Sequence, residues 1–489
     1  MLSSTLACTV LLSTLYIPCW IIYARFVHPL KDVPGPFLAS VSRFWLAYQV
    51  TTDRIDIIQR VLHEKYGPLV RIAPDEVSVA DPTSVKAIYR IKSGFTKTDF
   101  YTPWAANLTP HGDNFSERDK PKHNQRRRIV NSLYSMSSVL ESEKYIDACT
   151  DVFLDKMKTF SKAKRAVDLG EWIQWYTFDV IGELFYGQQF GFMRNEHDFG
   201  HYIGSLDILM PGITVLCMLP EYLRLFQMTL NLVFPSMRDA LQSYTDIRNA
   251  AKFWVERRMQ SMKEKEACRV DLLEKLFQVR NARSDFDIPE IQVESLGGIF
   301  AGSDTTAIAI RAILYYLIRT PVTYDKLMME IDATNRDGRL SRPHVKYSEA
   351  IKLPYLVACC KEGMHMHPSV GLSLPRHVPA GGKILAGRFF HPGAKDIFGK
   401  DAAVYNPDRW LRDAIAAAET DCHMLHFGGG SRTCIGKNIA LAEIHKIIPD
   451  LLRSYRLELV DIGKEWTTRN FWFNKQTGIE VYVTMRESE

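Results

Sequence analysis

The ten residues from Phe427 to Gly436, Phe-Gly-Gly-Gly-Ser-Arg-Thr-Cys-Ile-Gly, constrain this chain more than any other feature. A soft thiolate ligand needs an exposed sulfur, small neighbours that let a flat macrocycle approach the backbone, and donors that temper its charge. Cys434 meets these needs, because glycines flank it and Arg432 stands two residues before it. The apolar spacing that follows predicts a helix, whose positive N-terminal end favours an anionic sulfur.

The alternative interpretation of this loop is an inert free cysteine in a glycine turn. The pattern F-x-x-G-x-R-x-C-x-G has five fixed positions, and a chance match in a chain this long is expected about once in ten thousand. The pattern resembles the haem-binding loop of the cytochrome P450 family. That resemblance implies that Cys434 is the axial thiolate ligand of the haem iron, with Phe427, Arg432 and Gly436 around the cofactor.

Composition limits the remaining possibilities. The chain has 489 residues, 46% of them hydrophobic and 24% charged, and no long Pro/Ser/Gly linker follows residue 36, so we expect one large domain over 37–489. The nine cysteines are scattered and include no C-x-x-C pair, which argues against a disulfide framework and against a zinc site. The net charge of +5 is dispersed and does not argue for nucleic acid binding.

The periodicity of the apolar residues predicts a mainly α domain with a minor β-sheet, which is also the cytochrome P450 fold that the resemblance implies. Helical spacing covers residues 84–90, 145–159, 171–186, 238–263, 291–319 and 322–333. Alternation typical of strands occurs in residues 70–72, 77–80, 383–390 and 479–484.

The amino terminus predicts a membrane anchor. Residues 1–24 carry no charged side chain and are long enough to cross a bilayer as one transmembrane helix. Basic residues at 25, 28 and 31 follow, so the positive-inside rule leaves the rest of the chain cytosolic. Residues 25–36 resemble the basic, proline-rich hinge of microsomal family members, which implies a single-pass protein of the endoplasmic reticulum. A cleaved signal peptide is the alternative.

Two further segments match family positions that bind the haem propionates. His123 and Arg127 lie four residues apart on one face of a predicted helix, and Arg376 follows Leu374-Pro375. From the residues alone, the basic run at 126–128 is equally well a solvated face. The resemblance assigns all three side chains to the propionates.

Asp304 and Thr305 interrupt a long apolar helix, where a buried carboxylate and tandem threonines are costly. A kinked structural helix is one explanation. By resemblance, this stretch lies over the distal face of the haem, and the acid and the alcohol deliver protons to bound dioxygen.

The helix around Glu362 departs from the family pattern. Its signature is E-x-x-R, and this chain has His365 in place of the arginine, while Arg409 matches the third member of the buried network. Because imidazole cannot replace a five-donor guanidinium, we expect Glu362 to depend on Arg409 and this cluster to be the weak point of the protein.

A second departure lies between Gly393 and Ala394, where about a dozen residues of the family pattern, one to two strands, are missing. A faulty gene model, a true deletion and a degenerate paralogue all explain the gap. A lost strand predicts an unpaired sheet edge near the haem.

The resemblance also implies a substrate chamber whose walls suit an apolar small molecule, although each residue could equally be ordinary core. Its lining would include Tyr101, Trp104, Phe300, Ala301, Val370, Leu372 and Trp472.

The sequence as a whole predicts a monomeric, membrane-bound haem-thiolate monooxygenase of the EC 1.14 class, similar to those of fungal secondary-metabolite biosynthesis. It would hydroxylate or oxidatively dealkylate its substrate with O2. Electrons from NADPH would come from a separate cytochrome P450 reductase, because the chain has no flavin or dinucleotide motif. Two alternatives remain: a catalytically impaired haem-binding remnant, and a haem-thiolate isomerase or dehydratase.

Overall fold

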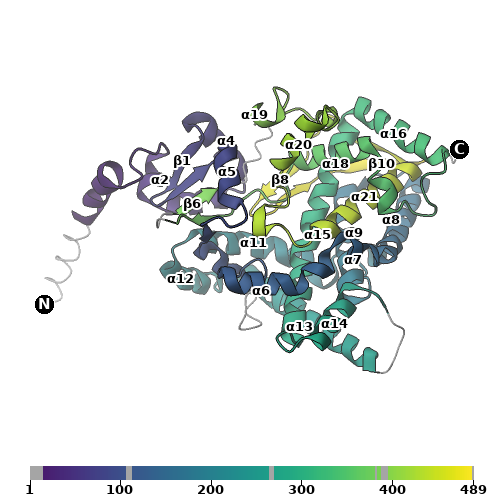
Figure 1. Cartoon of the computed structure of the whole chain (residues 1–489), viewed down its shortest axis with the longest axis horizontal. Helices are drawn as coiled ribbons and strands as arrows, with labels where there is room; N and C mark the ends of the chain where they lie inside the picture. The colour runs from purple at the N-terminus through teal and green to yellow at the C-terminus, as the bar shows by residue number, and fades with distance from the viewer. Residues whose placement is uncertain (1–14, 106–112, 264–268, 380–382, 387–394, 487–489) are drawn as a thin grey trace.

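The computed structural model describes residues 15–105, 113–263, 269–379, 383–386 and 395–486. Helices dominate, and Figure 1 shows them packed around one another with small sheets at two sides. The expected helices are confirmed with slightly longer bounds. The helices of eight residues or more are α3 (Phe44–Thr51), α4 (Ile55–Tyr66), α5 (Pro82–Tyr89), α6 (Lys120–Val130), α8 (Glu143–Ala163), α9 (Leu169–Tyr186), α11 (Tyr202–Met218), α12 (Glu221–Asn231), α13 (Pro235–Lys263), α14 (Leu272–Ala282), α15 (Ile288–Arg319), α16 (Pro321–Arg336), α18 (Pro354–Met366), α20 (Ala414–Cys422) and α21 (Lys437–Ser454).

Shorter helices connect these elements. They are α2 (Phe37–Val41), α7 (Met136–Leu140), α10 (Phe192–Asn195), α17 (Tyr347–Ala350) and α19 (Lys395–Phe398), with single turns η1 (Tyr23–Val27), η2 (Asp99–Trp104), η3 (Asn131–Tyr134), η4 (Phe199–His201), η5 (Pro407–Trp410) and η6 (Gly430–Arg432).

The strands form one five-stranded sheet and two smaller ones. The larger sheet has the order β1-β2-β6-β5-β3, the second β4-β10-β7, and β8 and β9 form a hairpin. The strands are β1 (Leu69–Ala73), β2 (Glu76–Val79), β3 (Thr96–Lys97), β4 (Val167–Asp168), β5 (Arg376–His377), β6 (Lys383–Ala386), β7 (Tyr455–Leu459), β8 (Thr467–Asn470), β9 (Asn474–Thr477) and β10 (Glu480–Met485).

The missing segment near 393–394 lies outside the described residues. The strand that precedes it, β6, pairs in parallel with β2 on one side and antiparallel with β5 on the other. β6 is therefore an interior strand, and the unpaired edge expected from the gap is not found at β6 itself.

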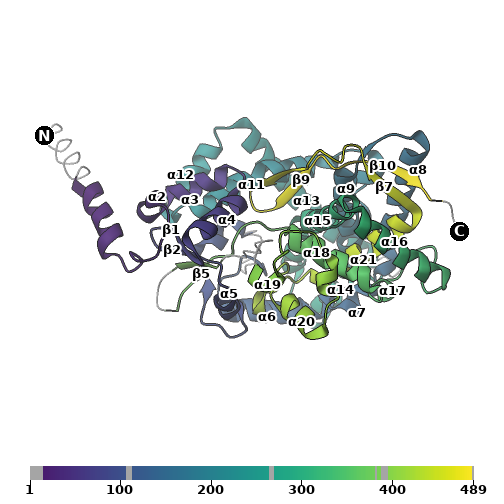
Figure 2. The same cartoon turned by 90° about the horizontal axis from the view of Figure 1, so that it is seen from above.

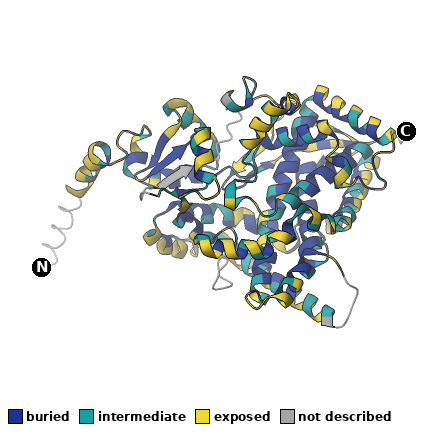
Figure 3. Ribbon diagram, viewed as in Figure 1, coloured by how far each residue is buried: buried dark blue, intermediate teal, exposed yellow. Residues whose placement is uncertain are grey.

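Helix α15 lies at the centre of the domain, and Figure 3 shows buried residues along its whole length. It begins with a capping box, because Asp287 caps the first turn and its backbone N–H donates to Oε2 of Glu290 at 3.2 Å. Helices α9, α18 and α21 pack against it. This rigid surrounding fixes the middle of α15, where Asp304 and Thr305 lie.

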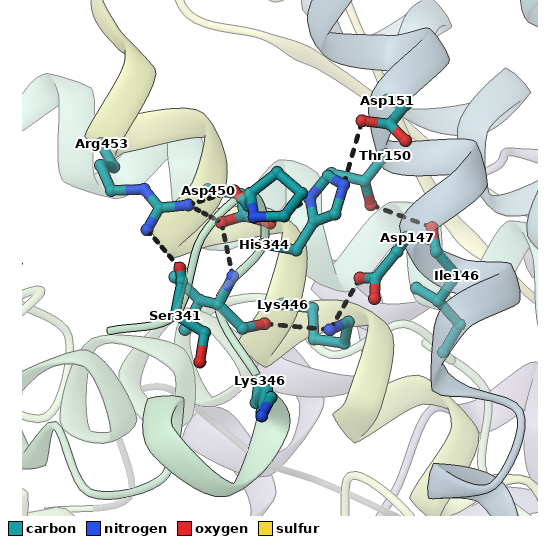
Figure 4. A network of polar contacts seen from close by, with 12 residues as sticks. Ile146, Asp147, Thr150, Asp151, Ser341, His344, Lys346, Lys446, Asp450 and Arg453 are labelled. Atoms are coloured by element: carbon teal, nitrogen blue, oxygen red, sulfur yellow. Dashed lines mark hydrogen bonds and ion pairs between the residues drawn. The ribbon is translucent and has the colours of Figure 1, made fainter. Parts of the chain in front are cut away.

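Helix α21 leads away from the Cys434 loop, and a polar network holds its far end (Figure 4). Nδ1 of His344 lies 3.0 Å from Asp450 Oδ2, and its Nε2 lies 3.0 Å from Asp151 Oδ1 on α8. Lys446 Nζ, on α21, lies 2.8 Å from Asp147 Oδ1, also on α8. The network ties α21 to α8 through the loop before α17.

The amino-terminal segment packs against the five-stranded sheet. Residues 15–22 are helical and continue into η1, while residues 34–36 are free of helix, as expected for a hinge. Arg71 on β1 donates from Nη1 to the carbonyl of Ala24 at 2.8 Å, and its backbone N–H donates to that of Pro34 at 2.7 Å. Within the described residues no helix is long and apolar enough to cross a membrane. Residues 1–14 of the expected anchor lie outside that part of the chain.

Candidate functional site

The Cys434 loop has a conformation that only glycine permits at one position. Gly430 has φ +63°, and a Cβ atom there would lie 1.9 Å from the carbonyl oxygen of Tyr89. The Cys434 N–H donates to the carbonyl of Phe427 at 2.7 Å, which closes the loop. The glycine-rich sequence therefore allows the loop to pack against the end of α5.

The Cys434 thiol is exposed, whereas Cys149, Cys217, Cys359 and Cys360 are buried. Gly436 caps α21 directly after it, so the sulfur lies near a helix N-terminus. Arg127 on α6 donates from Nη1 to the Thr433 carbonyl at 2.8 Å. Burial lowers the pKa of Arg127, and the neighbouring Cys434 opposes that shift. The loop thus presents an accessible sulfur beside a cation.

Cationic side chains gather next to this loop. Strands β3 and β5 pair Lys97 directly with Arg376, both almost fully buried. Arg432 donates from Nη1 to the Glu117 carbonyl at 2.8 Å, and His123 on α6 is also buried. Two like charges opposite each other in a sheet are destabilising, so this arrangement needs an anion.

The pKa values of these groups indicate the same need. Burial, then Arg432 and Arg376, hold the pKa of Lys97 well below its usual range, despite two nearby carboxylates. Burial, then Arg432 and Lys97, lowers the pKa of His123 to about 3. Nε2 of His123 is buried without a hydrogen-bond partner among the described residues. A dianionic group bound here would offset the positive charges and would accept a hydrogen bond from His123.

Asp304 is buried on α15 and accepts a hydrogen bond from Nε2 of Gln174 on α9. The amide oxygen of Gln174 in turn accepts from Nη2 of Arg311 at 2.9 Å. Burial raises the pKa of Asp304, while Lys475 and Arg311 oppose the shift. The carboxyl group is therefore closer to exchanging a proton near neutral pH than an exposed aspartate would be.

Thr305 bonds back onto the preceding turn of α15. Its Oγ1 donates to the carbonyl of Ala301, four residues earlier, at 2.6 Å. The carbonyl of Thr305 accepts from Ser369 Oγ at 2.7 Å. That Ser369 oxygen also lies 3.5 Å from Nε2 of His426, the residue before the Cys434 loop. Ser369 thus joins the middle of α15 to the start of the cysteine loop.

Glu362, His365 and Arg409 form the expected buried cluster. Glu362 Oε1 accepts from Arg409 Nε at 2.9 Å, and Oε2 lies 3.2 Å from His365 Nδ1. Trp410 Nε1 donates to Oε2 at 2.8 Å, and the Asn406 N–H donates to Oε1 at 2.8 Å. Glu362 therefore relies on more than Arg409, because tryptophan and backbone donors supplement the histidine.

The expected lining residues divide between two clusters. Trp104, Val370, Leu372 and Trp472 belong to one cluster, in which the rings of Trp104 and Trp472 lie 4.8 Å apart. Tyr101 is fully buried in the same cluster, but its hydroxyl bonds Arg376. It therefore also belongs to the group of cations.

The last two lining residues lie elsewhere. Phe300 packs against Tyr244 of α13 with ring centroids 5.3 Å apart, while Ala301 is exposed on α15. The structure thus gathers five of the seven expected residues.

Sequence reasoning missed Lys97, Ser369, Gln174 and Gln476, of which Gln476 donates from Nε2 to the Ile308 carbonyl of α15 at 3.0 Å. Lys97 follows Phe95-Thr96 in a strand of only two residues, which no periodicity could reveal. The amides and the serine carry no motif of their own. Only the sheet pairing and helix packing bring them to the site.

An exposed cysteine loop at a helix N-terminus, beside buried cationic side chains and a central helix that carries an acid–alcohol pair, is the arrangement of a haem-thiolate class of protein. A sequence model of the family described as Cytochrome P450 matches residues 34–481. The chain therefore belongs to the cytochrome P450 family.

Similar proteins come from fungi. The chain is 40% identical over 488 residues to cytochrome P450 monooxygenase gsfF of Penicillium aethiopicum, with 96% of each chain covered. It is 32% identical to a pisatin demethylase of Fusarium vanettenii, over 93% of this chain and 89% of that protein. It is also 32% identical to cytochrome P450 monooxygenase pkfB of Emericella nidulans, over 95% and 92%.

Family membership fixes the reaction class. The protein is a monooxygenase of the EC 1.14 class that uses haem held by a cysteine thiolate, O2, and electrons from a reductase. Its substrate is an apolar small molecule. The two alternatives raised by the sequence, an impaired remnant and an isomerase or dehydratase, gain no support from these relatives.

Proposed function

We propose that Cys434 is the axial ligand of the haem iron in a monooxygenase of fungal secondary metabolism. The observation that carries this proposal is the accessible Cys434 sulfur, which shares one loop with the cation Arg432. Arg127 holds the Thr433 carbonyl and so fixes the backbone beside the sulfur. When bound, the haem supplies the activation of dioxygen.

The cationic group fits the two propionates of haem. Arg376 and Arg432 would neutralise these carboxylates, while His123 and Lys97 add hydrogen-bond donors beside them. Burial and Arg376 lower the pKa of Arg432 to about 10, which is the cost of placing like charges together without an anion. Arg127, Phe427 and Gly436 would shape the proximal side around Cys434.

Asp304 and Thr305 are proposed to move protons at the distal side. Burial raises the pKa of Asp304, which makes its carboxyl group a better proton acceptor than an exposed aspartate. The hydroxyl of Thr305 gives its own hydrogen to Ala301, so its lone pairs would act as acceptors for a proton donor such as water. Gln174 orients the Asp304 carboxyl group from the opposite side.

The aromatic cluster of Trp104 and Trp472, with Val370 and Leu372, is proposed as the wall that contacts substrate. Such a wall recognises an apolar ring system by area and shape rather than by charge. Similarity to a pisatin demethylase favours oxidative dealkylation or hydroxylation of an aromatic secondary metabolite.

We infer that residues 1–24 anchor a monomeric protein in the endoplasmic reticulum membrane, with the catalytic domain in the cytosol. Supporting this, the described part of that segment exposes Leu15, Tyr16, Ile17 and Ile22. Arg71 binds Ala24 and would couple the anchor directly to β1.

The test is the ferrous carbon-monoxide spectrum of membrane-expressed protein. The parent should give the red-shifted band that requires a thiolate–iron bond, and Cys434→Ala should lose it. Cys422→Ala is the matched control, because Cys422 is equally exposed but lies outside the loop. A normal band from Cys434→Ala would refute the assignment.

A further inference from the structure

Three carbonyl groups in the middle of α15 accept hydrogen bonds from side chains. The carbonyl of Ala301 accepts from Thr305 Oγ1, that of Thr305 accepts from Ser369 Oγ at 2.7 Å, and that of Ile308 accepts from Gln476 Nε2 at 3.0 Å. A side chain that binds a helix carbonyl pulls that carbonyl outward and weakens the ladder bond. Only the first of these donors is on the helix itself.

The two outside donors are firmly placed. Ser369 and Gln476 are almost fully buried, at 4% and 1% exposure. The carbonyl of Ser369 accepts from the Asn474 N–H at 2.9 Å, and Nε2 of His367 lies 2.7 Å from the Asn474 carbonyl. Ser369 is thus fixed to β9, the strand that also carries Gln476.

Strand β9 reaches the acid as well as the alcohol. The backbone carbonyl of Gln476 accepts from Arg311 Nη1 at 3.4 Å, and Arg311 bonds Gln174, which bonds Asp304. The tip of the same hairpin carries Trp472, whose carbonyl accepts from the Gly371 N–H at 3.1 Å. One hairpin therefore carries a residue of the aromatic wall and is linked through Ser369 to Thr305, and through Arg311 and Gln174 to Asp304.

We propose that Ser369 and Gln476 are positioning residues for proton delivery. By holding the carbonyls of Thr305 and Ile308, they fix this turn of α15 and with it the position of the Thr305 hydroxyl. Without the Ser369 hydroxyl, the Thr305 carbonyl loses its outside donor and the threonine shifts by a fraction of an ångström, enough to impair a proton transfer. This inference rests on the role proposed for Thr305.

The experiment needs only O2, NADPH and purified reductase. When protons are delivered correctly, one O2, two NADPH and two protons yield two waters. When delivery fails, one O2, one NADPH and one proton yield one hydrogen peroxide. The measured quantity is therefore peroxide formed per NADPH consumed. Ser369→Ala should raise this ratio at least about twofold with an unchanged carbon-monoxide spectrum, because only the proton step is displaced.

Matched variants separate positioning from packing. Ser369→Thr, which keeps the hydroxyl, should restore the parent ratio. Gln476→Met, which keeps the length but removes the donor, should raise the ratio like Ser369→Ala and carries the test if Ser369→Ala does not bind haem. Ser295→Ala is the control, because it removes a buried hydroxyl from the same helix far from Thr305. Its ratio of peroxide to NADPH should equal that of the parent.

Thr305→Ala distinguishes this inference from the proposed function. If Thr305→Ala raises the ratio but Ser369→Ala and Gln476→Met match the parent, the positioning role is refuted and the role of Thr305 stands. If Thr305→Ala itself matches the parent, both the positioning role and the proton-delivery role of Thr305 are refuted. A Ser369→Thr variant that releases as much peroxide as Ser369→Ala also overturns the proposal.

Discussion

The imidazole of His344 bridges two aspartates on different helices, with Nδ1 3.0 Å from Asp450 Oδ2 on α21 and Nε2 3.0 Å from Asp151 Oδ1 on α8. The hydrogen bond that His344 donates to Asp450 raises the pKa of His344, and Asp147 adds to the effect, while burial opposes it. Lys446 and Arg453 also face this site and partly neutralise the carboxylates. The protonated imidazole therefore links the two helices.

We expect this link to make stability depend on pH. Because the folded-state pKa of His344 lies above its ordinary value of 6.5, the stabilisation is fully present below that value and is lost as pH rises through the folded-state pKa. His344→Gln should lower the urea midpoint most in mildly acidic buffer, and the deficit should shrink in alkaline buffer. A deficit that grows with pH would contradict the assignment.

Removing the charge of Glu362 should destabilise the folded protein. Glu362→Gln leaves the buried Arg409 guanidinium with only the partly exposed carboxylate of Asp401, at 3.1 Å, which should cost about 3 kcal/mol of unfolding free energy. His365→Gln keeps a donor near Glu362 and should cost only about 1 kcal/mol. Urea unfolding and the rate of haem loss measure both. If the two variants lost equal amounts of unfolding free energy, His365 would be as important to this cluster as the Glu362–Arg409 pair.

Lys97→Met should have opposite effects on two measurements. Removing a buried cation from beside Arg376 and Arg432 should raise the melting temperature of the haem-free protein. The same change should speed haem transfer to an acceptor such as apomyoglobin several-fold, because a propionate loses a partner. Lys122→Met, at an exposed position on α6, is the control. If haem loss is faster but the haem-free protein is not stabilised, repulsion between Lys97 and the two arginines is contradicted.

Deletion of residues 1–24 should release the protein from membranes only in part. Apolar side chains remain exposed on α12, including Tyr222, Leu225 and Phe226, and Figure 2 shows α12 at the same end of the molecule as α2 and α3. Arg43, just before α3, donates from Nε to the carbonyl of Met218 at 2.6 Å, which joins α3 to the end of α11, the helix that precedes α12.

This residual contact predicts partial sedimentation of the truncated protein with microsomes at low salt. Replacing the three α12 residues with serine should then release it. A truncated protein that remains fully soluble without detergent would exclude a second contact.

Features set by neighbouring residues could be predicted from the sequence. The long helices followed from apolar spacing, and β1, β2 and β10 from alternation. Strand β7 was missed because Tyr455 continues directly from α21 without a turn signal, and β8 and β9 were missed because their residues are mostly polar. Strand β7 is stabilised by pairing with β10, and β8 and β9 by pairing with each other, so the residues of each strand carry little signal of their own.

The sequence by itself determined the Cys434 loop, the acid–alcohol pair in α15 and the class of chemistry, because these depend on residue types at short, fixed spacing. Only the tertiary structure decided which cations meet, since Lys97 and Arg376 become neighbours through the pairing of β3 with β5. It alone also decided that Ser369 and Gln476 reach the carbonyls of α15. The physical reason is that a hydrogen bond or ion pair depends on distance in space, which only the packed chain fixes.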